Sequence, residues 1–133
     1  MSIVYYESQI MDNKQVLGVF DSGLGGLTVV AEIKKLYPKS SIVYLGDTAR
    51  VPYGTRSKEV VEEFAVQDAR FLESFGVDII IIACNTASAL ATDAVRKAVS
   101  VPVYEVITTA KAKAEEISTK IGVIGTRGTI NSG

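Results

Sequence analysis

The sequence contains no histidine and a single cysteine, Cys84, among its 133 residues. Without histidine, these residues cannot build a Ser-His-Asp triad, a Cys-His pair or a histidine-based metal site, so we expect no bound metal. One cysteine cannot form an internal disulfide, which makes a reducing compartment the default. Acid–base chemistry must therefore come from carboxylates, the thiol, tyrosine or lysine.

Strong charge and long apolar runs are also missing. The net charge is −1, which gives no reason to expect a nucleic acid or an anionic membrane as a partner. No apolar run approaches the roughly 18 residues that a membrane-spanning helix needs. Residues 1–14 lack the basic-then-apolar order of a secretory signal. We expect a cytoplasmic protein with no membrane partner.

Short β-branched runs alternate with segments of helical periodicity. The expected strands span residues 16–20, 42–45, 79–82, 101–106 and 121–124. Between them apolar residues recur at helical spacing, and each crossover is long enough for a right-handed βαβ unit. The sequence therefore predicts an α/β fold: a parallel β-sheet flanked by helices, in an open βαβ sandwich.

The same pattern suggests a domain organisation. Residues 1–15 show no convincing period and are interpreted as an N-terminal extension, and residues 16–100 as a first α/β domain. Residues 101–133 would begin a second α/β domain, in which Thr108 or Thr109 caps a helix. The last predicted strand and its polar loop are not followed by a helix, so we expect this second domain to be truncated.

Cys84 lies where the apolar run 79–82 gives way to the cap-type residues Asn85 and Thr86. In open α/β sheets, ligands bind at this edge, and a thiol near a helix N-terminus favours the thiolate form. A lone cysteine after an apolar strand is more often a buried hydrophobe. From this stretch alone, both interpretations stay open.

Other polar loops follow the strands and should converge on the same edge. They are Asp21-Ser22-Gly23, Gly46-Asp47-Thr48, Pro52-Tyr53-Gly54 and Thr126 to Thr129. Asp21 is interpreted as either a helix cap or a site residue, and Tyr53 as either a turn residue over the core or a site residue. Asp47 and Arg50 could form no more than a surface ion pair, worth ~0–1 kcal/mol.

The glycine-rich turn Gly23-Leu24-Gly25-Gly26 invites a nucleotide-binding interpretation. The dinucleotide fingerprint would need a glycine where Thr28 stands, and no Gly-Lys-Ser/Thr sequence of a P-loop occurs. Tight packing of strand against helix explains the glycines, although their amides could still bind a carboxylate.

These loops resemble glutamate racemase, of the cofactor-independent aspartate/glutamate racemase superfamily. The matching motifs are Gly18 to Thr28, Tyr44 to Gly54, Ala83 to Ser88, and Ile121 to Thr126 with Thr129. They follow one another in family order from residue 16 to residue 133. Four motifs at family spacing make the resemblance specific.

The resemblance implies interconversion of L- and D-glutamate with no cofactor, which supplies D-glutamate for peptidoglycan. Two cysteines flank the substrate's α-carbon in this family: one removes a proton and the other returns one from the opposite face. Cys84 matches the cysteine that deprotonates the D-isomer, and Asp21 matches a position that assists proton handling. Substrate contacts are implied for Asp21, Ser22, Tyr53, Gly54, Asn85 and Thr86, and Thr126 and Thr129 would lie near the substrate's carboxylate.

The sequence departs from the family in two places. After Val103 the family commonly runs towards a Pro-Gly pair, whereas Tyr104 and Glu105 stand here and alter how the next helix begins. The second half of the family pattern, with a Cys-Thr-His stretch that carries the second cysteine, has no counterpart in these 133 residues. One base cannot perform a two-base inversion, so we predict no racemisation by residues 1–133 alone.

Three interpretations therefore stay open. The chain is the N-terminal part of a glutamate racemase, part of a related racemase for aspartate or another amino acid, or a non-catalytic remnant that binds a ligand or a partner. The complete set of motifs favours glutamate as the small-molecule partner. We expect apolar surface to be exposed and to cause self-association, and a homodimer stays open.

Overall fold

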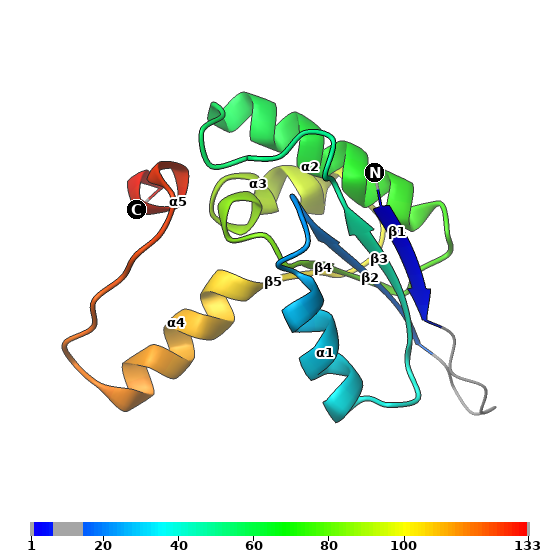
Figure 1. Ribbon diagram of the computed structural model, residues 1–133, viewed down its shortest axis with the longest axis horizontal. Helices are drawn as coiled ribbons and strands as arrows, with labels where there is room; N and C mark the ends of the chain where they lie inside the picture. The colour runs from blue at the N-terminus through cyan, green and yellow to red at the C-terminus, as the bar shows by residue number, and fades with distance from the viewer. Residues whose placement is uncertain (1, 7–14, 133) are drawn as a thin grey trace.

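A computed structural model describes residues 2–6 and 15–132 and places a five-stranded sheet at the centre of the molecule (Figure 1). The strands are β1 (Ser2–Tyr6), β2 (Val16–Asp21), β3 (Ser41–Gly46), β4 (Ile79–Ile82) and β5 (Val103–Glu105). The helices are α1 (Leu27–Leu36), α2 (Lys58–Glu73), α3 (Asn85–Ala98), α4 (Val106–Ile117) and α5 (Arg127–Asn131).

The strands are ordered β1-β3-β2-β4-β5, and the four from β2 to β5 run parallel to their neighbours. This confirms the predicted α/β fold with a parallel sheet flanked by helices. β5 pairs with β4 in the same sheet although it follows the domain boundary predicted at residue 100, and that boundary stays a prediction.

β1 adds an antiparallel strand at the outer side of β3, with Ser2 opposite Gly46. The lack of a period in residues 1–15 gave no sign of this strand. An outer strand presents unpaired backbone groups, so another segment can pair with it whatever its side-chain pattern. The rest of the predicted extension, residues 7–14, lies outside the described residues.

Alternate side chains of the strands enter two separate cores. Ile80 and Ile82 of β4, both fully buried, pack with residues of α2 and α3 on one face. Val19 and Ile42, also fully buried, pack beneath α1 on the opposite face. Figure 1 shows α2 and α3 together on one side of the sheet and α1 on the other. Full burial of each aliphatic side chain contributes about 1.5–3 kcal/mol to stability.

The strand β5 and the start of α4 differ from the sequence prediction. The strand expected over residues 101–106 is only three residues long, and α4 starts at Val106. The Glu105 carboxylate accepts hydrogen bonds from the second and third amides of α4, at 2.5 and 2.9 Å. Glu105, and neither Thr108 nor Thr109, is therefore the cap.

The strand predicted over residues 121–124 is absent from the described chain, and the prediction was wrong. Ile124 is 99% exposed, and the segment has no regular structure. A strand needs a neighbour for its backbone groups, and this stretch lies away from the sheet. The chain instead loops outwards after α4 and returns to place α5 beside α3 (Figure 1).

Candidate functional site

The polar loops converge where the order of the sheet reverses direction. β2 has β3 on one side and β4 on the other, and all three run parallel. The connections that leave β2 and β4 therefore separate to opposite faces of the sheet. This point, at the carboxyl ends of the strands, is where open α/β sheets bind ligands. Asp21 ends β2, and Cys84 follows β4 by two residues.

Cys84 is the N-cap of α3, and its thiol is 5% exposed. Its Sγ accepts a hydrogen bond from the Ala87 amide at 3.5 Å and donates to Ser22 Oγ at 3.4 Å. The four isoleucines form β4, which ends two residues before Cys84, and α3 begins with the polar residues Asn85 and Thr86. The sequence prediction of a thiol at the strand-to-helix junction is confirmed.

The Asp21 carboxylate organises the turn between β2 and α1. Its Oδ2 accepts hydrogen bonds from the amides of Gly23 at 3.2 Å and Gly26 at 3.0 Å. A side chain at Gly26 would meet Asp21 Cβ at 2.7 Å and Ala83 Cβ at 3.0 Å, so only glycine fits between the two strand ends. The helix-cap interpretation of Asp21 is wrong, because the N-cap of α1 is Gly26 and no side chain bonds to the first amides of the helix. Asp21 holds the turn before α1 instead, and its contact with a substrate stays a prediction.

Hydroxyl side chains form two separate contacts at this edge of the sheet, one between Ser22 and the thiol and one between the first turn of α3 and the start of α5. Ser22 is half-buried, Thr86 is 4% exposed, and Asn85 in the first turn of α3 is exposed. The hydroxyls of Thr86 and Thr126 lie 3.0 Å apart, and Thr126 in turn lies 2.9 Å from the hydroxyl of Thr129. The structure thus brings the first turn of α3 and the start of α5 together, as the predicted site required.

The side chain of Tyr53 is part of the core, and a contact of this residue with a substrate stays a prediction. Its side chain is 1% exposed and its hydroxyl points into the protein, where it contacts Asp47 at 2.5 Å and Asp68 at 2.9 Å. The interpretation of Tyr53 as a turn residue lying over the core is confirmed. The neighbouring Gly54 lies against the start of α5, because a side chain there would come within 2.6 Å of Thr126 Cγ2.

Asp47 and Arg50 are more than the surface pair that the sequence suggested. Asp47 is 2% exposed, and Arg50 bonds to both Asp47 and Asp68 at 2.6 and 2.7 Å. Sequence reasoning missed Asp68, although a signal was present. Asp68 lies on the same helical stripe as Val61, Ala65 and other buried apolar residues of α2, and a carboxylate on an apolar stripe needs buried partners.

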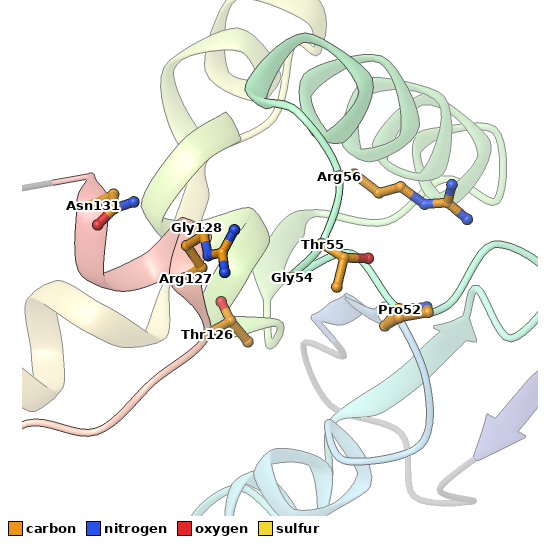
Figure 2. A pocket seen from close by; sticks show the side chains of 8 residues that line it. All are labelled: Pro52, Gly54, Thr55, Arg56, Thr126, Arg127, Gly128 and Asn131. Carbon is orange, nitrogen blue, oxygen red and sulfur yellow. The ribbon is translucent and has the colours of Figure 1, made fainter.

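A cavity of about 630 Å³ opens between the loop at Gly54 and the start of α5. It is lined by Pro52, Gly54, Thr55, Arg56, Thr126, Arg127, Gly128 and Asn131. Figure 2 shows the residues of α5 on one side and those of the loop on the other, with the Arg56 side chain directed away from α5. Thr126 connects this cavity to the first turn of α3 through its hydroxyl contact with Thr86.

The described residues lack metal-binding clusters of side chains and membrane-spanning helices. They contain no group of three or more histidine, cysteine or acidic side chains that could hold a metal ion. None of the helices in this part of the chain is long and apolar enough to cross a bilayer.

Tyr44 keeps its hydroxyl hydrogen. The Tyr44 hydroxyl donates to the Gly23 carbonyl. Burial, together with the charges of Asp21 and Cys84, raises the pKa of Tyr44, so this tyrosine remains a hydrogen-bond donor.

Comparison with known proteins gives a consistent family match. Residues 25–133 match the family model for Asp/Glu/Hydantoin racemase. A glutamate racemase from Aquifex pyrophilus is 53% identical over 119 residues, which are 88% of this chain and 47% of that protein. One from Persephonella marina is 50% identical over 119 residues, 88% of this chain and 46% of that protein. The chain spans about half the length of the curated relatives it matches.

Solved structures give the same result. The structure of glutamate racemase from Aquifex pyrophilus superimposes with a TM-score of 0.87 at 52% identity, over 89% of this chain and 48% of that one. Glutamate racemase from Francisella tularensis in complex with D-glutamate superimposes with a TM-score of 0.81 at 46% identity, over 90% of this chain and 45% of that one.

Proposed function

Since the chain belongs to the Asp/Glu/Hydantoin racemase family, we propose that it carries one side of a glutamate racemase active site. The observation that supports this most directly is the Cys84 thiol, held at the sheet edge 3.4 Å from Ser22 Oγ. In this proposal the whole protein interconverts L- and D-glutamate in the cytoplasm without a cofactor, and so supplies D-glutamate for peptidoglycan.

Cys84 acts as the base for the D-isomer. Its thiolate takes the proton from the α-carbon, so that an S–H bond forms while a C–H bond breaks and the electron pair stays on the substrate. No pyridine ring delocalises that charge, and positioned hydrogen-bond donors must stabilise it. The hydroxyls of Thr86 and Thr126, 3.0 Å apart, suit one carboxylate of the substrate.

The remaining residues hold this arrangement in place. Asp21 fixes the turn that presents Ser22, and in the proposal it also assists the movement of the proton. Gly54 offers its backbone next to Thr126, and Asn85 offers an exposed amide beside the thiol. The base for the opposite face has no candidate among residues 1–133, which contain one cysteine and no histidine.

The test of substrate class is a titration of the isotopically labelled chain, followed by the amide resonances of Ser22, Gly54 and Asn85. We expect D-glutamate to shift all three resonances more strongly than D-aspartate does. A stronger response to aspartate would favour a related racemase. No response to either amino acid up to its solubility limit would favour a non-catalytic remnant and refute the proposal.

The test of mechanism follows optical rotation with D- and L-glutamate. We expect no inversion by residues 1–133, because one thiol serves one face of the α-carbon. Racemisation by this chain that disappears in Cys84→Ser would show that the two-base assignment is wrong. Proton exchange at the α-carbon in D₂O without inversion would instead support Cys84 as the base of one face.

A further inference from the structure

Two buried carboxylates meet one tyrosine hydroxyl beneath the loop that carries Gly54. Asp47 and Asp68 are 2% and 1% exposed. Tyr53 Oη lies 2.5 Å from Asp47 Oδ2 and 2.9 Å from Asp68 Oδ2. Arg50 supplies positive charge, with Nε 2.6 Å from Asp47 Oδ2 and Nη2 2.7 Å from Asp68 Oδ1. We refer to Asp47, Arg50, Tyr53 and Asp68 as the loop cluster.

Tyr53 Oη makes two short contacts to carboxyl oxygens, and each contact needs a hydrogen between the two oxygens. If both carboxyl groups were ionised, only one hydrogen would be present. A tyrosine hydroxyl carries one hydrogen and can donate it to one carboxylate. The second short contact between oxygens is favourable only if the other carboxyl group carries a hydrogen. Charge gives the same answer, because one guanidinium balances one buried carboxylate and a second unbalanced one would be costly.

The geometry identifies the carboxyl group that holds this proton. Asp47 Oδ2 accepts from both Tyr53 and Arg50, so the oxygen that contacts Tyr53 acts as an acceptor there. Asp68 Oδ2 contacts Tyr53 Oη, while Asp68 Oδ1 accepts from Arg50 as a carbonyl oxygen can. Burial, assisted by the charge of Asp47, raises the pKa of Asp68 to about 6 despite the opposing contacts of Tyr53 and Arg50.

We propose that Asp68 takes up a proton in the folded chain at mildly acidic pH, and that in this form the hydrogen bonds from Asp68 to Tyr53 and from Tyr53 to Asp47 position the Gly54 backbone at the cavity. Asp68 is then a positioning residue on α2, remote from the chemistry. Only the use of Gly54 in substrate binding rests on the proposed function; the proton on Asp68 does not depend on it.

Few groups can compete for this proton. The charged and titratable groups that face Asp68 are Asp47, Arg50 and Tyr53, all from the loop after β3. On α2 itself, the neutral Gln67 accepts from Arg50 Nη1 at 2.6 Å. Burial and the two carboxylates raise the pKa of Tyr53 well above its usual range, so Tyr53 keeps its own hydrogen.

Loss of the proton should loosen the loop as the pH rises. The pKa of Asp68, about 6, lies above the value of roughly 3.9 expected in an unfolded chain. The stabilisation is therefore complete below pH ~4 and is lost as the pH rises through about 6. A shift of about two units corresponds to up to about a 100-fold fall in the folding equilibrium constant across this window.

The experiment is a pH titration of the labelled full chain by NMR. The carboxyl carbon of Asp68 should titrate near pH 6, and the Gly54 amide should follow the Asp68 midpoint. In Asp68→Asn, the side-chain amide donates to Tyr53 and its carbonyl accepts from Arg50, as protonated Asp68 does. We expect this variant to fold and to keep Gly54 in its low-pH environment at every pH.

Two variants test the positioning role separately from folding. Asp68→Ala and Tyr53→Phe should each lower the hydrogen-exchange protection of the Arg56 amide roughly 5–10-fold, the effect of a lost hydrogen bond. This amide donates to the Tyr53 carbonyl at 2.9 Å and closes the turn that contains Gly54. The Ser88 amide in α3 serves as the internal control and should be unchanged. Tyr53→Phe keeps the ring against Phe64, so it remains informative if Asp68→Ala does not fold.

Specific outcomes would refute the proposal. Titration of Asp47 instead of Asp68, or of neither above pH 5, would place the proton elsewhere. Unchanged protection of the Arg56 amide in Tyr53→Phe would remove the positioning role. Failure of glutamate to bind, with the titration of Asp68 and the response of Gly54 intact, would refute the proposed function and leave this inference standing.

Discussion

Residues 16–105 and residues 106–132 carry similar patterns of apolar and polar residues, yet they form very different structures. In the first region each strand has neighbours in the sheet and helices cover both faces, so Ile80 and Ile82 are fully buried. In the second, every residue of α4 is half-buried or exposed, and Ile124 is 99% exposed. The difference shows that a surface to pack against, more than periodicity, decides whether a strand forms.

The candidate site is divided in the same way. Asp21, Ser22 and Cys84 are held by the sheet edge and by the two helices that start there. Thr126 reaches the site from the second region, through its hydroxyl contact with Thr86 and its approach to Gly54. One wall of the site is therefore rigidly supported, and the other depends on few contacts.

The largest contrast should appear in a matched pair of isoleucines. Ile80→Ala removes a fully buried side chain from β4 and should lower the free energy of unfolding by about 2–5 kcal/mol. Ile124→Ala removes an exposed side chain and should change it by less than about 0.5 kcal/mol. Urea denaturation followed by circular dichroism measures both. Similar losses for the two variants would mean that residues 121–124 are packed in solution.

A pair of glycines gives the next largest effect. In Gly26→Ala the new methyl group meets Asp21 Cβ at 2.7 Å and Ala83 Cβ at 3.0 Å, where backbone must move, and we expect a loss of about 1–3 kcal/mol. In Gly54→Ala the methyl group meets Thr126 at 2.6 Å, and the second region can shift away, so the loss in global stability should be below about 1 kcal/mol.

The glycine pair is read by two measurements. Urea denaturation gives global stability, and the amide resonances of Thr126 and Arg127 report the position of α5. We expect Gly54→Ala to move these resonances while Gly26→Ala moves those of Ser22 instead. An equal loss of stability in both variants would show that α5 is held as firmly as the sheet.

Much of the first region could be predicted from the sequence, because each element there follows a local rule. The run from Ile79 to Ile82 has the composition of a strand covered on both faces, and Ser57, a residue type typical of N-caps, caps α2. The topology then brings the strand ends together, so the proximity of Asp21, Ser22 and Cys84 follows from the fold.

Other features depend on contacts between distant segments, which one sequence does not reveal. β1 forms because β3 offers it a free side, and the direction of the Tyr53 side chain depends on a carboxylate 15 residues away. The strand expected over residues 121–124 failed for the opposite reason, since its composition was suitable and no partner was at hand. For Asp68, the sequence shows that the residue lies on the apolar stripe of a helix, but it does not show that Arg50 and Tyr53 are its partners.

A smaller effect is expected at the link between the two regions. Thr126→Val removes the cap of α5 and the hydroxyl contact with Thr86, and should cost about 0.5–2 kcal/mol. Hydrogen exchange should show the loss in residues 127–131 and leave α3 protected. The matched control is Thr28→Val, which removes a hydroxyl bond to the Gly25 carbonyl inside the first region. Faster exchange throughout α3 would show that α5 is integral to the core.

The smallest effect on folding, and a clear effect on association, is expected at the exposed end of the second region. Val123 and Ile124 are 72% and 99% exposed, and contiguous exposed apolar side chains favour self-association. The double variant Val123→Lys/Ile124→Lys should keep the free energy of unfolding within about 0.5 kcal/mol and shift sedimentation towards the monomer. A defined dimer in the unaltered chain would confirm the predicted homodimer.

The control for this association is a second exposed apolar pair, in the first region. Leu36 and Tyr37 at the end of α1 are 72% and 61% exposed, comparable with Val123. If the apolar surface of the second region causes the association, Leu36→Lys/Tyr37→Lys should leave the sedimentation profile unchanged. Equal dispersal by both double variants would mean that general surface hydrophobicity is responsible. The two regions would then differ in packing but not in their interactions with other molecules.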